Sequence, residues 1–450
     1  MNNSDQIYTG PKMNDEPKID ISTVFNGFGV PDRTYVSQEN GKFEGQLTQG
    51  IKEGGTLCLI TGSSKTGKTT LYNKVLASLG RVPLLVRCDR SLTSDEFWTR
   101  PLEMLDFKNL KTIQSGVSTQ SQLAGKVGGK IGWQWLAGLI GEVSLGTTDA
   151  TSETEIREKI ISKPSPNHLV PLLKNSNAVL VVEDFHYLDG DVQKKIFQQW
   201  KSFSDEKVSV VVVGTTHHGV DLAYANSDLI GRIQQIDLKN WSIVDLVSIA
   251  RQGFDELSVG FQDKIMEAIA KECAGLPIVM QQVCAQLFVD KGYSELKIGS
   301  IVVFQEADAW RALHNVASNR YKQFETWYNR LAAGPRKNAR KYNTYELILT
   351  IFSLDPPTFQ ILRNEIDGRL KQLILPVGGY PPPASINSTL AALDKLQQSS
   401  GFELLEWIER DQMICILEPA FLFYLRWRKK RTAAPNLMDI LREVLALFAK

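Results

Sequence analysis

The segment TLCLITGSSKTGKTTLYNKVLASLG, residues 56–80, decides the fold. Its centre, GSSKTGKT at 62–69, fits the pattern G-x-x-x-x-G-K-[ST] in full, after an apolar run and before a helical one. Backbone N–H groups of such a turn point inward at phosphates, and the following helix N-terminus adds the positive end of its dipole. The sequence therefore predicts a phosphate-binding loop. The alternative is a glycine-rich strand–helix turn that binds nothing.

Within this loop we expect Lys68 to reach the β- and γ-phosphates of a nucleotide and Thr69 to offer its hydroxyl to Mg²⁺. The predicted nucleotide contacts come from one continuous run: Gly62, Ser63, Ser64, Lys65, Thr66, Gly67, Lys68, Thr69 and Thr70.

Four apolar runs predict buried β-strands, at residues 56–62, 83–89, 178–184 and 208–214. Helical patterns separate these runs, and the alternation is typical of a parallel α/β sheet. We assign residues 23–240 to this α/β core. A segment of about 115–154, rich in Gly, Ser and Thr, interrupts the pattern. We interpret it as a flexible or oligomer-contacting insert, with contact to lipid as the alternative.

The rest of the chain divides into four parts by pattern. The hairpin of residues 401–418 turns at Arg410-Asp411-Gln412 and follows three helical patterns, an order that predicts a winged helix-turn-helix. The four parts are a polar, disordered tail (1–22), an α-helical lid (241–335), the winged helix-turn-helix (336–431) and a C-terminal helix (432–450).

Polar residues follow two of the apolar runs. An acidic pair, Glu183 and Asp184, ends one strand, where burial of carboxylates is unfavourable unless a site requires them. In one register Glu183 faces Mg²⁺ and Asp184 orients the attacking water; in the other, Asp184 is the metal carboxylate and Glu183 is structural. After the last run, Thr216 and His217 either sense a γ-phosphate or belong to an ordinary loop.

Together these motifs make residues 23–430 resemble the STAND-type, AAA+-related P-loop ATPases of bacteria. The order of the phosphate loop, the acidic pair, the 229–232 segment and the Gly-Leu-Pro motif at 275–277 carries the resemblance. It implies an ASCE-type ATPase core that binds ATP or ADP with Mg²⁺. It also places Arg232 in a helix, where it would reach the γ-phosphate in cis or across a subunit boundary; a surface salt bridge is the alternative. Pro277 would pack near the nucleotide, and Tyr35 and Val36 would line the adenine pocket.

Two departures from that family bear on function. The metal-facing carboxylate is Glu183 where Asp is usual, and His217 stands where many relatives have Arg. The resemblance then implies a slow ATPase acting as a nucleotide switch that oligomerises or engages a separate effector, in bacterial antiphage defence or signalling. The alternative is a DNA-binding AAA+ ATPase of the initiator or transposition-regulator type.

Composition narrows these alternatives. Lys and Arg number 51 against 50 Asp and Glu, so the net charge of +1 excludes a strongly basic nucleic-acid coat. Basic runs at 336–341 and 426–431 leave local DNA contact open, but the third helix of the winged region, 385–399, holds only one Lys and one Asp. Five scattered cysteines predict buried free thiols. With no signal peptide and no apolar run of 18 residues, a cytoplasmic protein without a membrane-spanning segment is expected.

Overall fold

The computed structural model describes residues 18–104 and 165–432, except 28, 30, 175, 215–228, 230, 239, 298, 336–340 and 376–377, with side chains to residue 428. The chain forms two compact units, each described by itself. The core unit is Ser37–Trp241, and the helical unit combines Met1–Val36 with Ser242–Lys450. The predicted insert at 115–154, residues 1–17 of the predicted tail and the last helix beyond 432 lie outside the described residues.

The core unit contains a five-stranded parallel sheet in the order β3-β4-β5-β2-β6. Strand β5 separates β2, which leads into the phosphate loop, from β4, which ends in the acidic pair. This is the ASCE arrangement, so the predicted α/β fold is confirmed. The strands are β2 (Leu57–Gly62), β3 (Val82–Arg87), β4 (Ala178–Glu183), β5 (Val210–Val213) and β6 (Ile233–Leu238).

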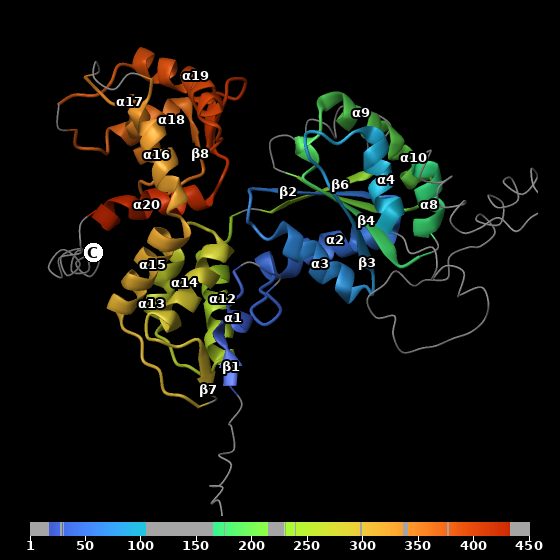
Figure 1. Cartoon of the computed structure of the whole chain (residues 1–450), viewed down its shortest axis with the longest axis horizontal. Helices are drawn as coiled ribbons and strands as arrows, with labels where there is room; N and C mark the ends of the chain where they lie inside the picture. The colour runs from blue at the N-terminus through green and yellow to red at the C-terminus, as the bar shows by residue number, and fades with distance from the viewer. Residues whose placement is uncertain are drawn as a thin grey trace, which may run out of the picture. The chain divides into compact units, whose positions relative to one another are not determined.

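Helices cover both faces of this sheet (Figure 1). Alternate residues of each strand enter opposite cores, so Cys58 and Ile60 pack on one face and Leu57 and Leu59 on the other. The first face is covered by α2 (Lys42–Glu53) and α3 (Lys68–Ser78). The second is covered by α4 (Ser94–Met104), α8 (Pro166–Lys174), α9 (Gly190–Gln199) and α10 (Lys201–Asp205).

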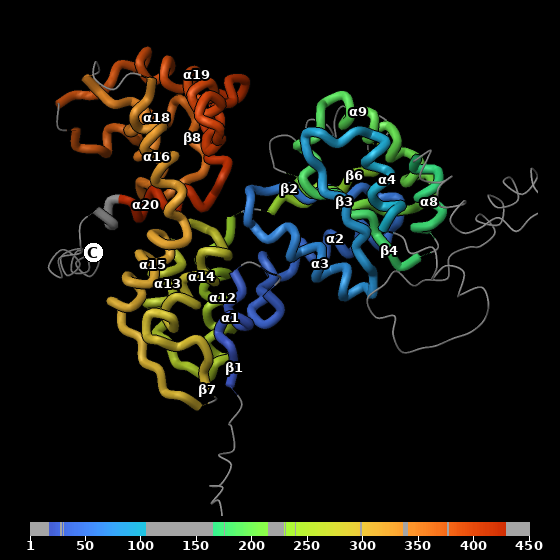
Figure 2. Tube along the Cα trace, in the orientation of Figure 1, coloured from blue at the N-terminus to red at the C-terminus, as the bar shows by residue number. Residues whose placement is uncertain are grey.

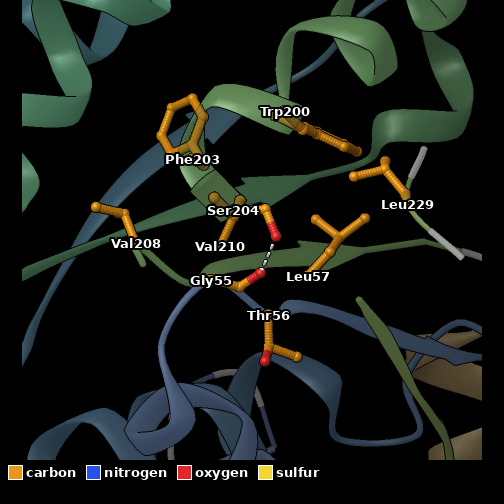
Figure 3. Close-up of a pocket in the computed structure, with 9 residues that line it drawn as sticks. All are labelled: Gly55, Thr56, Leu57, Trp200, Phe203, Ser204, Val208, Val210 and Leu229. Carbon is orange, nitrogen blue, oxygen red and sulfur yellow. Dashed lines mark hydrogen bonds between the residues drawn. The ribbon is translucent and has the colours of Figure 1, made fainter. Parts of the chain in front are cut away.

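A small, mainly apolar cavity lies at the amino ends of β2 and β5 (Figure 3). Trp200, Phe203 and Leu229 line it, and the Ser204 hydroxyl donates a hydrogen bond to the Gly55 carbonyl beside it. The phosphate loop follows the carboxyl end of β2. The cavity is therefore at the opposite end of the sheet from the candidate site.

In the helical unit, the N-terminal segment packs against a bundle of helices. Strand β1 (Lys18–Asp20) pairs antiparallel with β7 (Glu295–Lys297), and α1 (Ile21–Val24) follows it beside the helices (Figure 2). Phe25 packs against Phe254 and Phe288. Residues 23–36 thus belong with the helical unit, which corrects the predicted core boundary. The helices are α12 (Ile243–Glu256), α13 (Asp263–Glu272), α14 (Pro277–Val289), α15 (Glu306–Arg320) and α16 (Gln323–Ala333).

Among the described residues, the C-terminal part of this unit combines four helices with an antiparallel sheet in the order β8-β10-β9. The second of the three helical patterns predicted before the hairpin covers residues 358–370. Its first part is wrong, because residues 360–362 form β8 and α18 begins only after them. Winged-helix identity remains a prediction. The elements are α17 (Thr344–Phe352), β8 (Gln360–Leu362), α18 (Arg363–Leu370), α19 (Pro383–Ser400), β9 (Leu405–Ile408), β10 (Met413–Ile416) and α20 (Ala420–Thr432).

All five cysteines are buried and unpaired, as the sequence predicted. Among the described helices, none has the length and apolar character needed to cross a lipid bilayer.

Candidate nucleotide-binding site

The phosphate loop turns through left-handed backbone at two positions, Lys65 with φ of 63° and Gly67 with φ of 98°. Successive turns of this kind aim N–H groups into a common hollow that suits an anion. Gly62 opens the loop with φ of 145°, and a Cβ there would lie 2.7 Å from the Leu238 carbonyl oxygen. Only glycine fits this close approach of two strands. Helix α3 then begins at Lys68, directly behind the loop.

The Lys68 side chain folds over its own loop. Its Nζ donates to the carbonyl oxygens of Gly62 at 2.9 Å and Ser63 at 2.6 Å. Burial lowers the pKa of Lys68 to about 8, although the charges of Asp184 and Glu183 act in the opposite direction. A charged ammonium in a partly desolvated site attracts phosphate more strongly than one in bulk water.

Glu183 is the centre of a hydrogen-bonded cluster at the end of β4. The hydroxyl of Thr69 donates to Glu183 Oε1 at 2.8 Å, and the hydroxyl of Tyr72 donates to the same oxygen at 2.9 Å. The other oxygen accepts from Arg87 Nε at 3.2 Å. The Glu183 side chain is only 11% exposed, so these three donors offset the loss of water around its charge. The contacts fix the carboxylate beside the phosphate loop.

The pair formed by Thr69 and Glu183 fits Mg²⁺. This ion prefers oxygen ligands at about 2.0–2.1 Å in octahedral geometry, which places neighbouring ligands about 2.9 Å apart. The Thr69 hydroxyl and Glu183 carboxylate oxygens are 2.8 Å apart. Mg²⁺ is usually held by one or two protein ligands together with phosphates and water. The two side chains can therefore be adjacent ligands of one ion.

Asp184 follows directly, with a left-handed backbone at φ of 59°. A non-glycine residue in this region is uncommon, and such conformations gather at functional sites. Asp184 precedes the short turn Phe185–Tyr187 and is exposed. Partial desolvation and the neighbouring Glu183 charge raise the pKa of Asp184, against the effect of Lys68 and Arg87. A carboxylate with a raised pKa is a better proton acceptor.

The structure does not bring Arg232 to the phosphate loop of its own chain. Arg232 lies in a turn before β6, not in a helix, and its carbonyl accepts from the Leu57 backbone N–H at the amino end of β2. Its guanidinium pairs with Asp205 at 2.6 Å. The role in cis is therefore wrong, and the alternative of a surface salt bridge describes the observed contact. A role across a subunit boundary remains a prediction.

Other predicted residues are not part of the described geometry. Thr216 and His217 lie outside the described residues. Tyr35, Val36 and Pro277 belong to the helical unit, so their nucleotide contacts remain predictions. Within that unit, Pro277 is the first residue of α14.

Sequence reasoning missed three residues that contact the site, Tyr72, Arg87 and Trp241. The signal for Tyr72 was its spacing, because it lies three positions after Thr69 and therefore on the same helix face. Arg87 stands opposite Glu183 in the β3–β4 register. The Trp241 indole Nε1 donates to the Thr66 carbonyl at 2.9 Å, and no sequence pattern points to this contact.

The basic run at 426–431 begins with two arginines that serve the helical unit itself. Arg426 pairs with Glu272 at 3.1 Å and Asp355 at 2.9 Å, and its side chain is 9% exposed. Arg428 lies 3.5 Å from the centre of the Tyr328 ring. Arg426 is therefore committed to contacts inside the unit, and Arg428 is partly engaged there, with its side chain 27% exposed. Residues 336–340 of the other basic run lie outside the described residues.

The comparisons with known proteins agree with this geometry. Residues 51–218 match the family described as the AAA domain. The core unit has the P-loop ATPase fold. A comparison with curated proteins found no match.

Solved structures give only weak similarity. A Walker-type ATPase of Pyrococcus abyssi is 16% identical over 86% of this chain and 95% of its own, with a TM-score of 0.48. The Orc1 protein of Aeropyrum pernix, solved in complex with DNA, is 13% identical over 92% and 98%, with a TM-score of 0.38. The RuvB Holliday junction branch migration motor of Thermotoga maritima is 12% identical over 89% and 96%, with a TM-score of 0.36. No functional argument follows from scores this low.

Proposed function

We propose that the chain binds ATP with Mg²⁺ at the phosphate loop and hydrolyses it slowly. The observation that carries this proposal is the 2.8 Å contact between Thr69 and Glu183, which joins the phosphate loop to the acidic strand. It favours the register in which Glu183 and Thr69 hold the metal ion and Asp184 orients the attacking water. When bound, Mg²⁺ would neutralise charge on the phosphates.

The side chains then have separate tasks. Lys68 exchanges its two carbonyl acceptors for phosphate oxygens, and the loop N–H groups orient the phosphate chain. Tyr72 and Arg87 hold the Glu183 carboxylate in place by donating hydrogen bonds to its two oxygens. Asp184 accepts a hydrogen bond from water and takes its proton as the water oxygen bonds to the γ-phosphorus. The bond from the γ-phosphorus to the bridging oxygen breaks, and ADP leaves. The departure to Glu at the metal position, where Asp is usual, is the reason we infer slow turnover.

We further propose that nucleotide state acts as a switch whose output is self-association or binding of a separate effector, in bacterial antiphage defence or signalling. This part follows from the STAND resemblance alone. The DNA-binding alternative has less support, because Arg426 and Arg428 are engaged inside the helical unit and α19 carries few cations.

Phosphate release from ATP by the purified full chain tests the enzyme proposal. The Asp184→Asn variant should lose about 10²–10⁴-fold in rate, the usual contribution of a general base, while its affinity for ADP is kept. Asp191→Asn is a matched control, because Asp191 is a surface carboxylate of the same unit whose side chain is 93% exposed. Equal rates for wild type and Asp184→Asn would overturn the hydrolytic role.

A further inference from the structure

Trp241 connects the phosphate loop with the start of the helical unit. It is the last residue of the core unit, and its partly buried side chain lies over the loop. Its Nε1 donates to the Thr66 carbonyl at 2.9 Å. Its ring also lies over Gly67, since a Cβ built on that glycine would be 3.7 Å from Trp241 Cζ2. One side chain therefore contacts both residues of the Thr66–Gly67 peptide.

The planarity of the peptide bond gives this contact a consequence. The carbonyl of Thr66 and the N–H of Gly67 belong to one rigid plane and point in opposite directions. Because the indole holds the carbonyl on one side, the Gly67 N–H is directed to the other. In loops of this pattern that N–H is one of the groups that cradle phosphate. The indole thus orients a phosphate donor without touching phosphate itself.

Hydrogen bonds hold the first turn of α12, which begins directly after Trp241. Ser242 is the N-cap of α12, and its hydroxyl accepts from the Asp245 backbone N–H at 3.1 Å and donates to the Asp245 carboxylate at 2.8 Å. Leu246 N–H bonds to the Ser242 carbonyl at 3.0 Å. Trp241 is therefore one peptide bond away from the capped first turn of α12.

We propose that Trp241 is a positioning residue that orients the Thr66–Gly67 peptide for phosphate and couples nucleotide binding to the start of α12. The proposal rests on the proposed nucleotide site. Coupling is reciprocal, so a nucleotide that fixes the loop also fixes the indole and the turn behind it.

Trp241→Phe removes the N–H donor and keeps an aromatic ring against Gly67. Trp98→Phe is the matched control, because the Trp98 indole donates to Gln199 Oε1 at 2.7 Å in the same unit, on the sheet face away from α3. Both full-length variants are compared with wild type by thermal melting, by binding of ATP with Mg²⁺, and by hydrogen–deuterium exchange of the amides of residues 245–249 with and without ATP.

In the wild type we expect ATP to slow exchange of these amides, and in Trp241→Phe we expect that slowing to disappear. We expect the affinity of Trp241→Phe for ATP to fall about threefold to tenfold, the effect of losing one hydrogen bond. Trp98→Phe should melt at a lower temperature and keep both responses. If Trp241→Phe shows the wild-type affinity and protection, the Trp241 proposal is overturned and the nucleotide site stands. If the wild type binds no nucleotide, both proposals fail together.

Discussion

Two buried charged groups, one in each unit, have similar burial and different surroundings. Glu183 in the core unit is 11% exposed and accepts hydrogen bonds from two hydroxyls and a guanidinium. Arg426 in the helical unit is 9% exposed and is held by two carboxylates and the Ser353 carbonyl. Each charge is compensated by several partners, as buried charges must be.

The position in the fold separates the two clusters. Glu183 lies at the carboxyl end of a parallel strand, where open α/β sheets bind ligands, and a phosphate loop is beside it. Arg426 joins α20 to α13 and to the loop after α17, and within the described residues no glycine-rich loop accompanies it. A buried charge therefore marks a candidate site only where the backbone around it can also bind a ligand. We expect substitutions at Arg426 to change stability, and substitutions around Glu183 to change nucleotide chemistry.

The largest effect on stability is expected from Arg426→Met. Removing one partner of a buried ion pair destabilises by about 3–5 kcal/mol, and the exposed Asp355 places this case near 3 kcal/mol. Urea unfolding measures the loss, with Arg251→Met as control because its pair with Asp263 is exposed and exposed ion pairs contribute little to stability. If the two variants lose equal free energy of unfolding, Arg426 contributes no more to stability than a surface arginine does. ATP affinity should not change in either.

The pH dependence of kcat/KM for ATP is the next test, because it reports groups of the free enzyme. Burial lowers the pKa of Lys68 to about 8, so its charged form is lost as the pH rises through that value. We expect kcat/KM to fall above about pH 8, approaching tenfold per pH unit, as phosphate loses its cation. A profile that stays flat to pH 10 would contradict this environment for Lys68.

Tyr72→Phe is expected to weaken binding of ATP with Mg²⁺ by about 2–10-fold, the effect of one lost hydrogen bond to Glu183. Binding in the presence of EDTA should change less, because Tyr72 acts through the metal carboxylate. Tyr328→Phe removes the same kind of contact, a phenol hydroxyl 2.9 Å from the Glu346 carboxylate in the helical unit. If both variants keep wild-type binding, Tyr72 has only a packing role.

The smallest effect is expected from Arg87→Met, because the Arg87 side chain is 72% exposed and its charge is screened by water. Arg87 lowers the pKa of Asp184, so its removal raises that pKa further. Asp184 works as an ionised group, and activity is lost as the pH falls through its pKa. The acidic limb of the rate profile should therefore move to higher pH. If the acidic limb does not move, Arg87 has no effect on the pKa of Asp184.

The fold was predictable where buried strands give continuous apolar runs in the sequence. Strands β2, β4 and β5 are fully buried and β3 is partly buried, and each of the four was predicted within two residues at either end. Strand β6 was missed because it lies at the sheet edge, where Gln234, Gln235 and Asp237 interrupt the apolar pattern. Residues 18–22 were predicted as part of a disordered tail and residues 23–36 as part of the core, because the pairing of β1 with β7 joins residues far apart in sequence.

The site was predictable where the motif itself carries the chemistry. The phosphate loop and the acidic pair are contiguous in sequence, so their residue types and spacing define them. Three further residues reach the site only because of the three-dimensional fold. Helix periodicity places Tyr72 there and strand register places Arg87. Trp241 reaches it because the chain comes back to the phosphate loop after β6. Arg232 was misplaced for the same reason, since a resemblance gives its order along the chain but not the end of the sheet at which it lies.

Calorimetric titration of the full chain with ATP, in Mg²⁺ and in EDTA, tests the nucleotide site most directly. We predict saturable binding by the wild type that is tighter with Mg²⁺, and a loss of about 30-fold or more in Lys68→Ala, since removing one partner of a buried charge pair costs about 2–5 kcal/mol. Lys174→Ala, which breaks an exposed pair with Glu206, should bind as the wild type does. No heat of binding in the wild type, or equal affinity in Lys68→Ala, would contradict the proposed site.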